Sequence, residues 1–396
     1  MNNTIVIIGA GQAGLTVAMS LRDKGWTGQI HLVSAEDHIP YQRPPLSKGY
    51  LAGTETGTDL ALTSPQALFE RDITGHFGTA VLRVDREKQQ VDLSDGKTLS
   101  YNKLIFATGS QPRDLEIPGS ELIGIHTVRT TTDADLLRAS FAEGGDTVFI
   151  GGGFLNLEVA VEALKYGAVT VLEVAPQILG RVLSLPAANA LADYHASLGI
   201  DIRCGVTIER ILGDSGRVTG VELGDSTQLA ATRIVVSIGA VARDELAAQA
   251  GLATDRGIVV DQHLRTSDPD VFAIGDCAVF PSIFAGSQMR IESVQNATDQ
   301  ARHVAEMITG SAESGYQAVP WFWSVQGERR LQIAGLASPE DEAQIVEQDP
   351  AKGKLVVERL RNGEVVAVET INAPGPHMKA RRALASTAPS GLQVSM

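Results

Sequence analysis

The fold class is decided by residues 5–14, which read IVIIGAGQAG. The first four form an apolar run without polar alternation, which predicts a parallel strand covered on both faces. The glycines have separate uses: Gly9 permits a tight turn, Gly11 lets the backbone approach a pyrophosphate, and Gly14 lets a helix pack closely on the strand. The helix after the turn would present its N-terminal N–H groups to an anion. This stretch therefore predicts the start of a dinucleotide-binding unit.

The sequence that follows completes a βαβ unit. A helix is expected from about Gln12 to Lys24, and a second strand at residues 30–33. Glu36 lies about 20 residues beyond the glycine turn, where a carboxylate can bind a ribose hydroxyl. The alternative interpretation makes Glu36 a solvated surface charge beside Asp37.

A second βαβ unit begins at residues 147–153, TVFIGGG, and continues with a helix to about residue 166 and a strand at residues 169–173. This unit is too far from the first for one mononucleotide-binding fold, so the chain is expected to contain two. Gly151, Gly153 and Phe154 are its candidate contacts to a nicotinamide nucleotide.

Glu173 ends the second strand of this unit. A carboxylate there accepts a hydrogen bond from the adenosine ribose 2′-OH and repels a 2′-phosphate. Residues 174–177 contain no arginine for a 2′-phosphate, and the candidate Arg181 lies slightly further along. NADH is therefore favoured over NADPH.

The second motif departs from the pattern at its third glycine position, which holds Asn156. An asparagine there would either push the helix away from the strand or turn its amide toward the ligand. Either outcome would alter the binding of a nicotinamide nucleotide.

The rest of the chain contains further strand patterns. Strands are expected at residues 91–93 and 104–106, with residues 94–97 as a turn between them. Two more buried strands are expected at residues 234–239 and 271–276, each reaching a glycine.

The pattern changes from Pro320 onward. Alternating segments at residues 354–357 and 365–368, split by Asn362-Gly363, predict an antiparallel sheet. The chain is therefore expected to be an α/β protein with two Rossmann-like dinucleotide-binding domains and a small α+β C-terminal domain. The expected domains are residues 1–115 with 243–319, residues 116–242, and residues 320–396.

The composition excludes several classes of protein. With 396 residues the chain exceeds the roughly 250–300 at which one core stops growing. Its net charge of −14 would repel a phosphate backbone, so nucleic acid is excluded as a partner. The apolar stretch at residues 5–21 is interrupted by glycines and is a poor membrane span, and the N-terminus lacks a signal peptide pattern. A cytoplasmic location without a membrane partner is expected.

Cys204 and Cys277 are the two cysteines, and they form no CxxC pair. A disulfide framework and a CxxC redox pair are therefore excluded. An iron–sulfur cluster of the chain's own is excluded too, because it normally needs four thiolates. No metal site is expected.

Several motifs in order carry a resemblance that covers nearly the whole chain. It resembles the FAD-dependent, NADH-linked ferredoxin reductases that serve cytochrome P450s and Rieske dioxygenases, whose fold is glutathione-reductase-like. The resemblance implies bound FAD in the first domain, NADH as co-substrate in the second, and a [2Fe–2S] ferredoxin as acceptor. The motifs are residues 9–14, PPLSK at 44–48, ATG at 107–109, GGGFLNLE at 151–158, GDCA at 275–278, RIESVQNA at 290–297 and PWFW at 320–323.

The resemblance also implies roles for single residues near the flavin. Arg43 and Lys48 would lie along it, where a cation favours the acceptance of hydride; the alternative for Lys48 is a solvated loop lysine. Asp276 would bind the ribityl chain or the phosphates, unless it is only a turn aspartate. The helix that begins at Ser293 and Val294 would direct its positive end toward the flavin.

The resemblance also implies positions for Glu158 and Trp323. Glu158 would lie near the nicotinamide, and a Lys48–Glu158 pair over the flavin is the most specific geometric prediction. Trp323 is expected either in the core of the C-terminal domain or at the flavin edge as an electron exit. Further candidate cofactor contacts are Ala107, Thr108, Gly109 and Gly239. The chain has Val325 where the family usually has an aspartate, so we expect partner docking to differ at this point.

The absence of a cysteine pair decides the reaction class. Disulfide reductases of this fold pass two electrons to thiols beside the flavin. FAD can take a hydride and release single electrons, so a one-electron acceptor such as a [2Fe–2S] ferredoxin fits this chain. Ferredoxins are usually acidic, so docking needs a local basic patch, for which residues 328–330 and 379–382 are candidates.

Two alternatives stay open at this point. One changes only the acceptor, to rubredoxin or an ascorbate radical. The other is a slow, NADH-responsive flavoprotein with a binding or signalling role, like the apoptosis-inducing-factor relatives of this fold, and Asn156 is its motivation. A monomer or a weak homodimer is expected.

Overall fold

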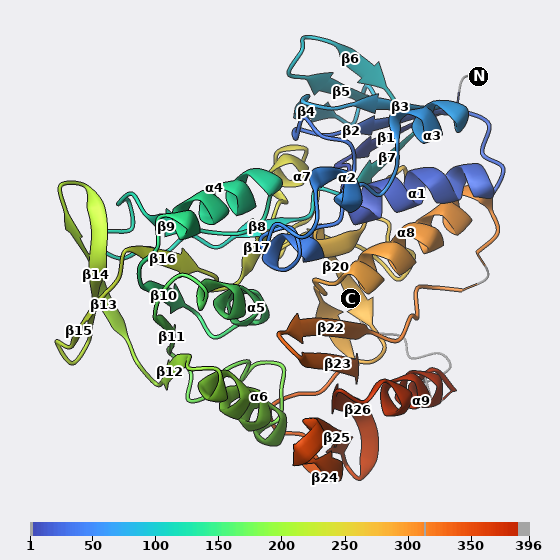
Figure 1. Cartoon of the computed structure of the whole chain (residues 1–396). Helices are drawn as coiled ribbons and strands as arrows, with labels where there is room; N and C mark the ends of the chain where they lie inside the picture. Colours follow the sequence, from blue (N-terminus) through green and yellow to red (C-terminus); the bar gives the residue numbers. More distant parts are fainter. Residues whose placement is uncertain (1–2, 313, 387–396) are drawn as a thin grey trace.

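Two parallel sheets form the centre of the computed structural model, which describes residues 3–312 and 314–386 (Figure 1). In the first sheet β1 lies in the middle, and its residues 5–7 are completely buried. This burial explains the unbroken apolar run in the sequence. The strands in spatial order are β19 (Val271–Ala273), β7 (Lys103–Phe106), β1 (Thr4–Ile8), β2 (Gln29–Val33) and β3 (Ile73–His76).

Helix α1 (Gln12–Asp23) begins directly after the first glycine turn, as predicted, and packs beside α8 (Val294–Thr309) on this sheet (Figure 1). A small antiparallel sheet of β4 (Val81–Asp85), β5 (Gln90–Leu93) and β6 (Thr98–Ser100) lies against it, where β6 contacts β1. The predicted turn at residues 94–97 therefore joins β5 to β6. The chain then passes through β6, which pairs back on β5, before it enters the predicted strand at residues 104–106 as part of β7.

The second parallel sheet repeats this design. Its strands in order are β12 (Asp201–Cys204), β11 (Val169–Glu173), β10 (Thr147–Ile150), β16 (Arg233–Val236) and β9 (Ile125–His126). Its helices are α4 (Thr131–Ala142), α5 (Phe154–Ala163) and α6 (Leu185–Ser197). Helix α5 ends earlier than predicted because the N–H groups of Lys165 and Tyr166 bond three residues back, which tightens the last turn.

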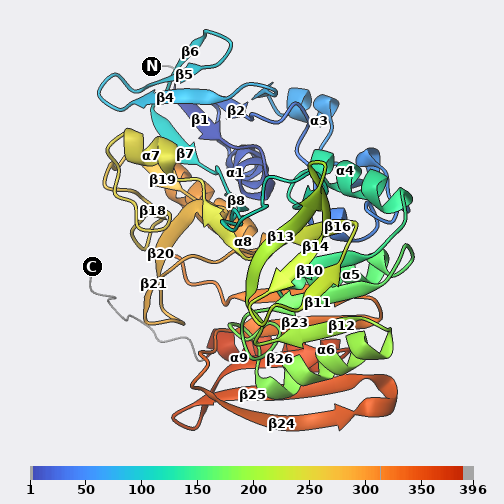
Figure 2. The ribbon, with the colours of Figure 1, turned by 90° about the vertical axis from the view of Figure 1, so that its left-hand side faces the viewer.

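Two antiparallel features lie beside the parallel sheets. A three-stranded sheet of β13 (Ile208–Asp214), β14 (Arg217–Leu223) and β15 (Gln228–Ala230) extends from the second one (Figure 2). Strands β8 (Ser110–Pro112) and β17 (Ala240–Ala242) pair with each other where the chain passes between the two parallel sheets. The chain thus crosses between the two sheets twice, along one paired segment.

The C-terminal part is a five-stranded antiparallel sheet with one helix, as the alternating pattern predicted. Asn362 and Gly363 both have positive φ and form the predicted turn between two of its strands. Figure 2 shows this sheet below the two parallel ones. Its elements are β22 (Trp321–Gln326), β23 (Arg329–Gly335), β26 (Glu364–Ile371), β25 (Lys354–Arg361) and β24 (Glu342–Asp349) in spatial order, with α9 (Pro374–Ser386).

Shorter elements complete the connections. The predicted strands at residues 234–239 and 271–276 end before their glycines, because Gly239 and Gly275 have φ of +111° and +75° and turn the chain out of the sheet. No helix within residues 3–312 and 314–386 has the length and apolarity needed to cross a membrane. The short elements are η1 (Pro44–Ser47), α2 (Gly57–Leu60), α3 (Pro65–Glu70), α7 (Glu245–Gln249), β18 (Ile258–Val259), η2 (Gly275–Cys277), β20 (Ala278–Ser282), β21 (Ser287–Met289) and η3 (Pro350–Lys352).

The replacement Gly14→Ala tests the close packing of α1 on β1. A Cβ at Gly14 would lie 1.9 Å from the carbonyl oxygen of Gly9, so the helix has to move away. Alanine normally stabilises a helix interior relative to glycine, yet here we expect a loss of about 1–3 kcal/mol in the free energy of unfolding. Chemical denaturation of the variant and the wild-type protein measures this loss of stability. The control Gly375→Ala in α9, where a Cβ meets nothing within 4 Å, should be neutral or stabilising; equal effects of the two changes would contradict the account.

Candidate active site

One large cavity lies where the two parallel sheets and the C-terminal sheet meet. Its volume of about 1790 Å³ exceeds the roughly 300–1,000 Å³ of a site for one drug-sized ligand, so it has room for two nucleotides. Nearly all the site residues predicted from the sequence line it. They are Gly9, Gly11, Glu36, Arg43, Lys48, Ala107, Thr108, Gly109, Gly151, Gly153, Phe154, Glu158, Glu173, Arg181, Gly239, Asp276, Ser293, Val294 and Trp323.

The first glycine turn fits a dinucleotide. Gly9 has φ of +107°, and a Cβ there would lie 2.1 Å from the carbonyl oxygen of Ala107, so only glycine fits. A Cβ at Gly11 would meet no protein atom within 4 Å, although Gly11 lines the cavity at the N-terminus of α1. This open space beside backbone N–H groups suits the pyrophosphate of FAD.

Glu36 lies in the cavity wall within a charged cluster. Its Oε1 is 2.5 Å from Nη2 of Arg43, and its Oε2 accepts a 2.5 Å hydrogen bond from the hydroxyl of Tyr41. Burial acts to raise the pKa of Glu36, but the charge of Arg43 and these hydrogen bonds outweigh it and lower the pKa. Burial, with help from Glu36, raises the pKa of Tyr41 to about 12. Glu36 is therefore an ionised acceptor at neutral pH.

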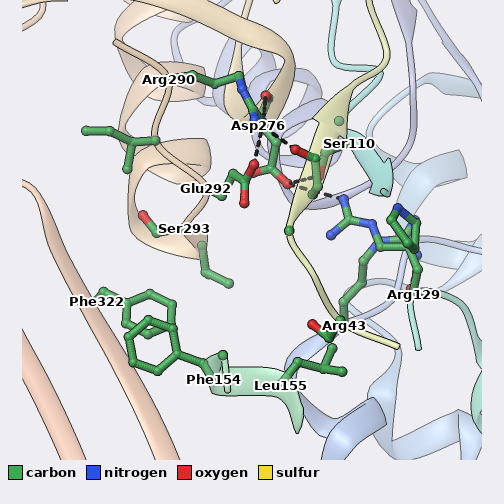
Figure 3. A pocket seen from close by; sticks show the side chains of 18 of the residues that line it. Arg43, Ser110, Arg129, Phe154, Leu155, Asp276, Arg290, Glu292, Ser293 and Phe322 are labelled. Carbon is green, nitrogen blue, oxygen red and sulfur yellow. Dashed lines mark hydrogen bonds and ion pairs between the residues drawn. The ribbon is translucent and has the colours of Figure 1, made fainter. Parts of the chain in front are cut away.

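Asp276 faces the same cavity at the end of the first sheet (Figure 3). Its Oδ2 accepts hydrogen bonds from Ser110 Oγ at 2.9 Å and from Arg129 Nη2 at 3.2 Å. The guanidinium of Arg290 bonds the carbonyl oxygen of Asp276 and pairs with Glu292 at 2.5 Å. The carboxylate of Asp276 is thus fixed in place rather than being a free turn aspartate.

Sequence reasoning missed Arg129 and Ser110. Arg129 lies in no glycine motif, and its partner Asp276 is 147 residues away. Burial lowers the pKa of Arg129, against the opposing effect of Asp276. The capping threonine Thr130 that follows Arg129 marks the start of α4, but it gives no sign of the contact with Asp276.

Helix α8 begins where it was predicted, and its N-terminus opens onto the cavity. Ser293 caps it by accepting a 3.0 Å hydrogen bond from the N–H of Asn296. Val294 and Ala297 line the cavity in the first turn. The partial positive charge of this helix end therefore points toward bound ligand.

The second glycine turn is built like the first. A Cβ at Gly151, whose φ is +100°, would lie 2.3 Å from the carbonyl oxygen of Ser237. Glu173 accepts backbone hydrogen bonds from Gly152 at 2.6 Å and from Ala175 at 2.8 Å. These bonds hold the carboxylate of Glu173 at the cavity wall, which fits the ribose of a second dinucleotide.

Asn156 and Gly14 are the two predicted binding residues that do not line the cavity. Asn156 is completely buried, and its Nδ2 donates to the carbonyl oxygens of Ile150 and Gly151, both at 2.8 Å. Its amide is turned toward the strand end, so the alternative in which it faces the ligand was wrong. Asn156 ties helix α5 to the glycine turn by hydrogen bonds, where a glycine would do so by close packing.

Lys48 and Glu158 meet at the junction of all three sheets. Lys48 Nζ lies 2.5 Å from Glu158 Oε2, and the Glu158 side chain is only 8% exposed. Lys48 follows η1, and Glu158 lies on α5. The aromatic wall beside them contains Phe154 and Phe322, whose ring centroids are 4.6 Å apart (Figure 3).

Trp323 also lines the cavity, and its ring lies 5.4 Å from that of Trp321. Both belong to β22 at the cavity rim. Trp323 is therefore a wall residue and does not lie in the core of the C-terminal sheet.

Both cysteines are free thiols. Cys277 is fully buried, its Sγ directed at the backbone carbonyl of Ile274 at 3.3 Å, and burial raises its pKa. The two thiols therefore offer no disulfide for electrons to enter.

Two glycine turns that open onto one cavity, with no cysteine pair, define an oxidoreductase built around two dinucleotides. A pyridine nucleotide-disulphide oxidoreductase model matches residues 3–301, and a reductase C-terminal model matches residues 321–393. The chain belongs to the pyridine nucleotide-disulphide oxidoreductase family. This membership confirms the predicted fold class and the prediction of an FAD- and NADH-dependent oxidoreductase.

Individual relatives extend along the whole chain. Rhodocoxin reductase from Rhodococcus erythropolis is 42% identical over 98% of this chain and 90% of that protein. Rubredoxin-NAD(+) reductase from Pseudomonas putida is 37% identical over 93% of this chain and 96% of that protein.

Two crystal structures superpose closely on the chain. The ferredoxin reductase for the CYP199A2 system from Rhodopseudomonas palustris has a TM-score of 0.94 and 39% identity, and covers 97% of this chain and 95% of its own. The reductase in a covalent putidaredoxin reductase–putidaredoxin complex has a TM-score of 0.93 and 36% identity, and covers 99% and 97%. The predicted resemblance to ferredoxin reductases is confirmed.

Gly11→Ala tests the first turn as a pyrophosphate site. Gly11 has φ of −75°, which alanine adopts freely, so the protein should fold with wild-type stability. The added methyl group would occupy the space kept open for the ligand, and we expect FAD affinity to fall at least about tenfold. The flavin-to-protein ratio after purification and a titration with FAD measure it. A fully yellow variant with unchanged affinity would contradict the assignment.

Proposed function

We propose that the protein is a flavoprotein reductase that takes electrons from NADH through FAD and passes them singly to a [2Fe–2S] ferredoxin serving a cytochrome P450 or a Rieske oxygenase. The observation that carries the proposal is the single cavity onto which both glycine turns open, with Lys48 and Glu158 between them. Ferredoxin and redoxin reductases among the relatives support it.

We assign the first parallel sheet to FAD. The open space at Gly11 takes the pyrophosphate, and the ionised Glu36 accepts from the adenosine ribose. Asp276 hydrogen-bonds the ribityl chain or the phosphates, and the N-terminus of α8 stabilises negative charge on the reduced ring. Bound FAD supplies the chemistry, since it accepts hydride and can give up electrons one at a time.

We assign the second parallel sheet to NADH. Glu173 is held by two backbone N–H groups, so it can accept from a ribose 2′-OH and repels a 2′-phosphate. Glu158 and Lys48 lie between the two nucleotide sites and orient the nicotinamide against the flavin. The domains that follow from this division are residues 1–115 with 243–319 for FAD, 116–242 for NADH, and 320–396.

The electron exit is proposed at Trp323 and Trp321. Arg381 lies over the ring of Trp321, with its guanidinium carbon 4.2 Å from the ring centroid. Burial, followed by the charges of Arg381 and Arg330, lowers the pKa of the neighbouring His377 to about 4. Arg381 therefore lies beside the tryptophan pair, and we propose that an acidic ferredoxin docks at this face.

We call Arg330, Lys379, Arg381 and Arg382 the basic cluster. Of the candidate charges, Arg329 is left out of this cluster, because it is only partly exposed and its guanidinium lies 4.3 Å from the ring centroid of Tyr194. Arg330, Lys379 and Arg382 are exposed.

A rubredoxin is the second candidate acceptor, and the rubredoxin-NAD(+) reductase relative favours it. The slow signalling flavoprotein loses its motivation, since the Asn156 amide bonds the glycine turn and Asn156 does not line the cavity. A cytoplasmic location, which supplies NADH, and a monomer or weak homodimer are part of the proposal.

Anaerobic mixing of the FAD-loaded protein with NADH or NADPH tests the proposed function. NADH should bleach the oxidised-flavin absorbance at least about tenfold faster than NADPH, because Glu173 repels the 2′-phosphate. Glu173→Gln keeps the shape of the side chain but removes its charge. It should lower the ratio of the bleaching rate with NADH to that with NADPH about tenfold. The control Glu121→Gln changes an exposed carboxylate outside the cavity and should leave the preference intact. If neither NADH nor NADPH bleached the flavin, the proposal would be overturned.

Charge reversal tests the docking site. Arg330→Glu should lower the kcat/KM for a [2Fe–2S] ferredoxin about tenfold at low salt, and added salt should erase the difference. Bleaching by NADH should stay at the wild-type rate. Arg256→Glu reverses an arginine that is 90% exposed and outside the basic cluster, and should affect neither step. The docking site would be refuted if the two reversals slowed ferredoxin reduction equally.

A further inference from the structure

One face of β22 lies against two helices of the second parallel sheet, α5 and α6. Phe322, Ser324 and Gln326 alternate along the strand and therefore share this face. Phe322 packs on Phe154, and Ser324 Oγ lies 2.7 Å from Oε1 of Glu158. Both contacts fall on one side of α5, because Phe154 and Glu158 are four residues apart.

Gln326 continues the line of contacts to α6. Its Oε1 is 2.8 Å from Nε2 of His195, and its Nε2 is 3.2 Å from Ser324 Oγ. His195, Ser324 and Gln326 are completely buried. A chain of hydrogen bonds thus runs from His195 through Gln326 and Ser324 to Glu158.

The charge on Glu158 fixes the direction of every bond in this chain. A carboxylate paired with Lys48 can only accept, so Ser324 must donate its hydroxyl proton to it. Ser324 Oγ then accepts from the amide N–H of Gln326, which leaves the amide oxygen to face His195.

His195 must therefore carry its proton on Nε2. Its Nδ1 is buried and finds no hydrogen-bond partner among the described residues, as suits the nitrogen that bears no proton. Burial lowers the pKa of His195, which keeps the ring neutral. All four groups agree with one direction of donation, toward the carboxylate of Glu158.

Four donors hold that carboxylate. Oε2 accepts from Lys48 Nζ and Ser47 Oγ, both at 2.5 Å. Oε1 accepts from Ser324 Oγ at 2.7 Å and from the N–H of Val325 at 3.3 Å. The donors come from the end of η1 with the residue after it and from β22, so both sides of the cavity fix the orientation of Glu158.

We propose that Ser324 and Gln326 are positioning residues for hydride transfer, which hold the Glu158 carboxylate in the orientation that pairs it with Lys48. The inference rests on the proposed function for its consequence in catalysis. It gives the C-terminal sheet a part in the NADH reaction as well as in docking. It also explains why Val325 can replace an acidic residue here, since its contact with Glu158 uses only the backbone N–H.

A double-mutant cycle on the FAD-loaded protein tests the proposal. Ser324→Ala removes one donor to a charged group, and bleaching by NADH should slow about tenfold. If Ser324 acts through Glu158, the variant that combines Ser324→Ala with Glu158→Gln should be no slower than Glu158→Gln alone. Gln326→Leu should give a smaller loss of about threefold. Thr370→Val is the control: its buried hydroxyl donates to Gln332 in the same sheet without reaching Glu158, so it should bleach at the wild-type rate.

The crystal structure of the FAD-loaded Ser324→Ala variant gives a second readout. We expect the Glu158 carboxylate to turn, so that Lys48 Nζ and Glu158 Oε2 separate beyond the roughly 4 Å of an ion pair. An unchanged pair, or a slowing by Ser324→Ala that persists in full beside Glu158→Gln, would overturn the proposal. If the wild-type protein were not bleached by NADH, the proposed function would fail, and the separation in the crystal would still decide whether Ser324 positions Glu158.

Discussion

The architecture depends on the close approach of backbone to backbone at the two glycine turns. At Gly9 and Gly151 the neighbouring carbonyl oxygens of Ala107 and Ser237 leave no room for a side chain. Because the turns are this tight, each helix starts directly at the carboxyl end of its strand, and its N–H groups face the cavity. Every other feature of the site is arranged around these two openings.

In the proposed function, the Lys48–Glu158 pair lies where the two nucleotides meet. Lys48 comes from a loop of the first parallel sheet, Glu158 from a helix of the second, and Ser324 from the C-terminal sheet. Because the pair and the serine that bonds it come from three sheets, its geometry depends on how those sheets are placed relative to one another.

Local patterns predicted much of this structure. The apolar runs beside glycines located β1, β10 and β11 because such runs are characteristic of buried parallel strands. The turn at Asn362 was predictable because only a few residues accept its positive φ. The Lys48–Glu158 contact came from a family resemblance and not from spacing, since 110 residues separate the two.

Contacts without a local pattern could not be predicted. Arg129 reaches Asp276 across 147 residues, and nothing near Arg129 announces a partner. The orientation of Asn156 was undecided because it depends on carbonyl groups that only the folded turn presents. Likewise, the part played by Ser324 and Gln326 appears only when β22 lies against α5 and α6.

A crystal structure of the FAD-loaded protein with NADH bound would show directly whether the two nucleotides meet at the Lys48–Glu158 pair. We expect the FAD pyrophosphate beside Gly11, the NADH ribose on Glu173, and the Lys48–Glu158 pair against the flavin where the two nucleotides meet. An NADH molecule bound outside this cavity, or a Lys48–Glu158 pair that contacts neither nucleotide, would contradict it.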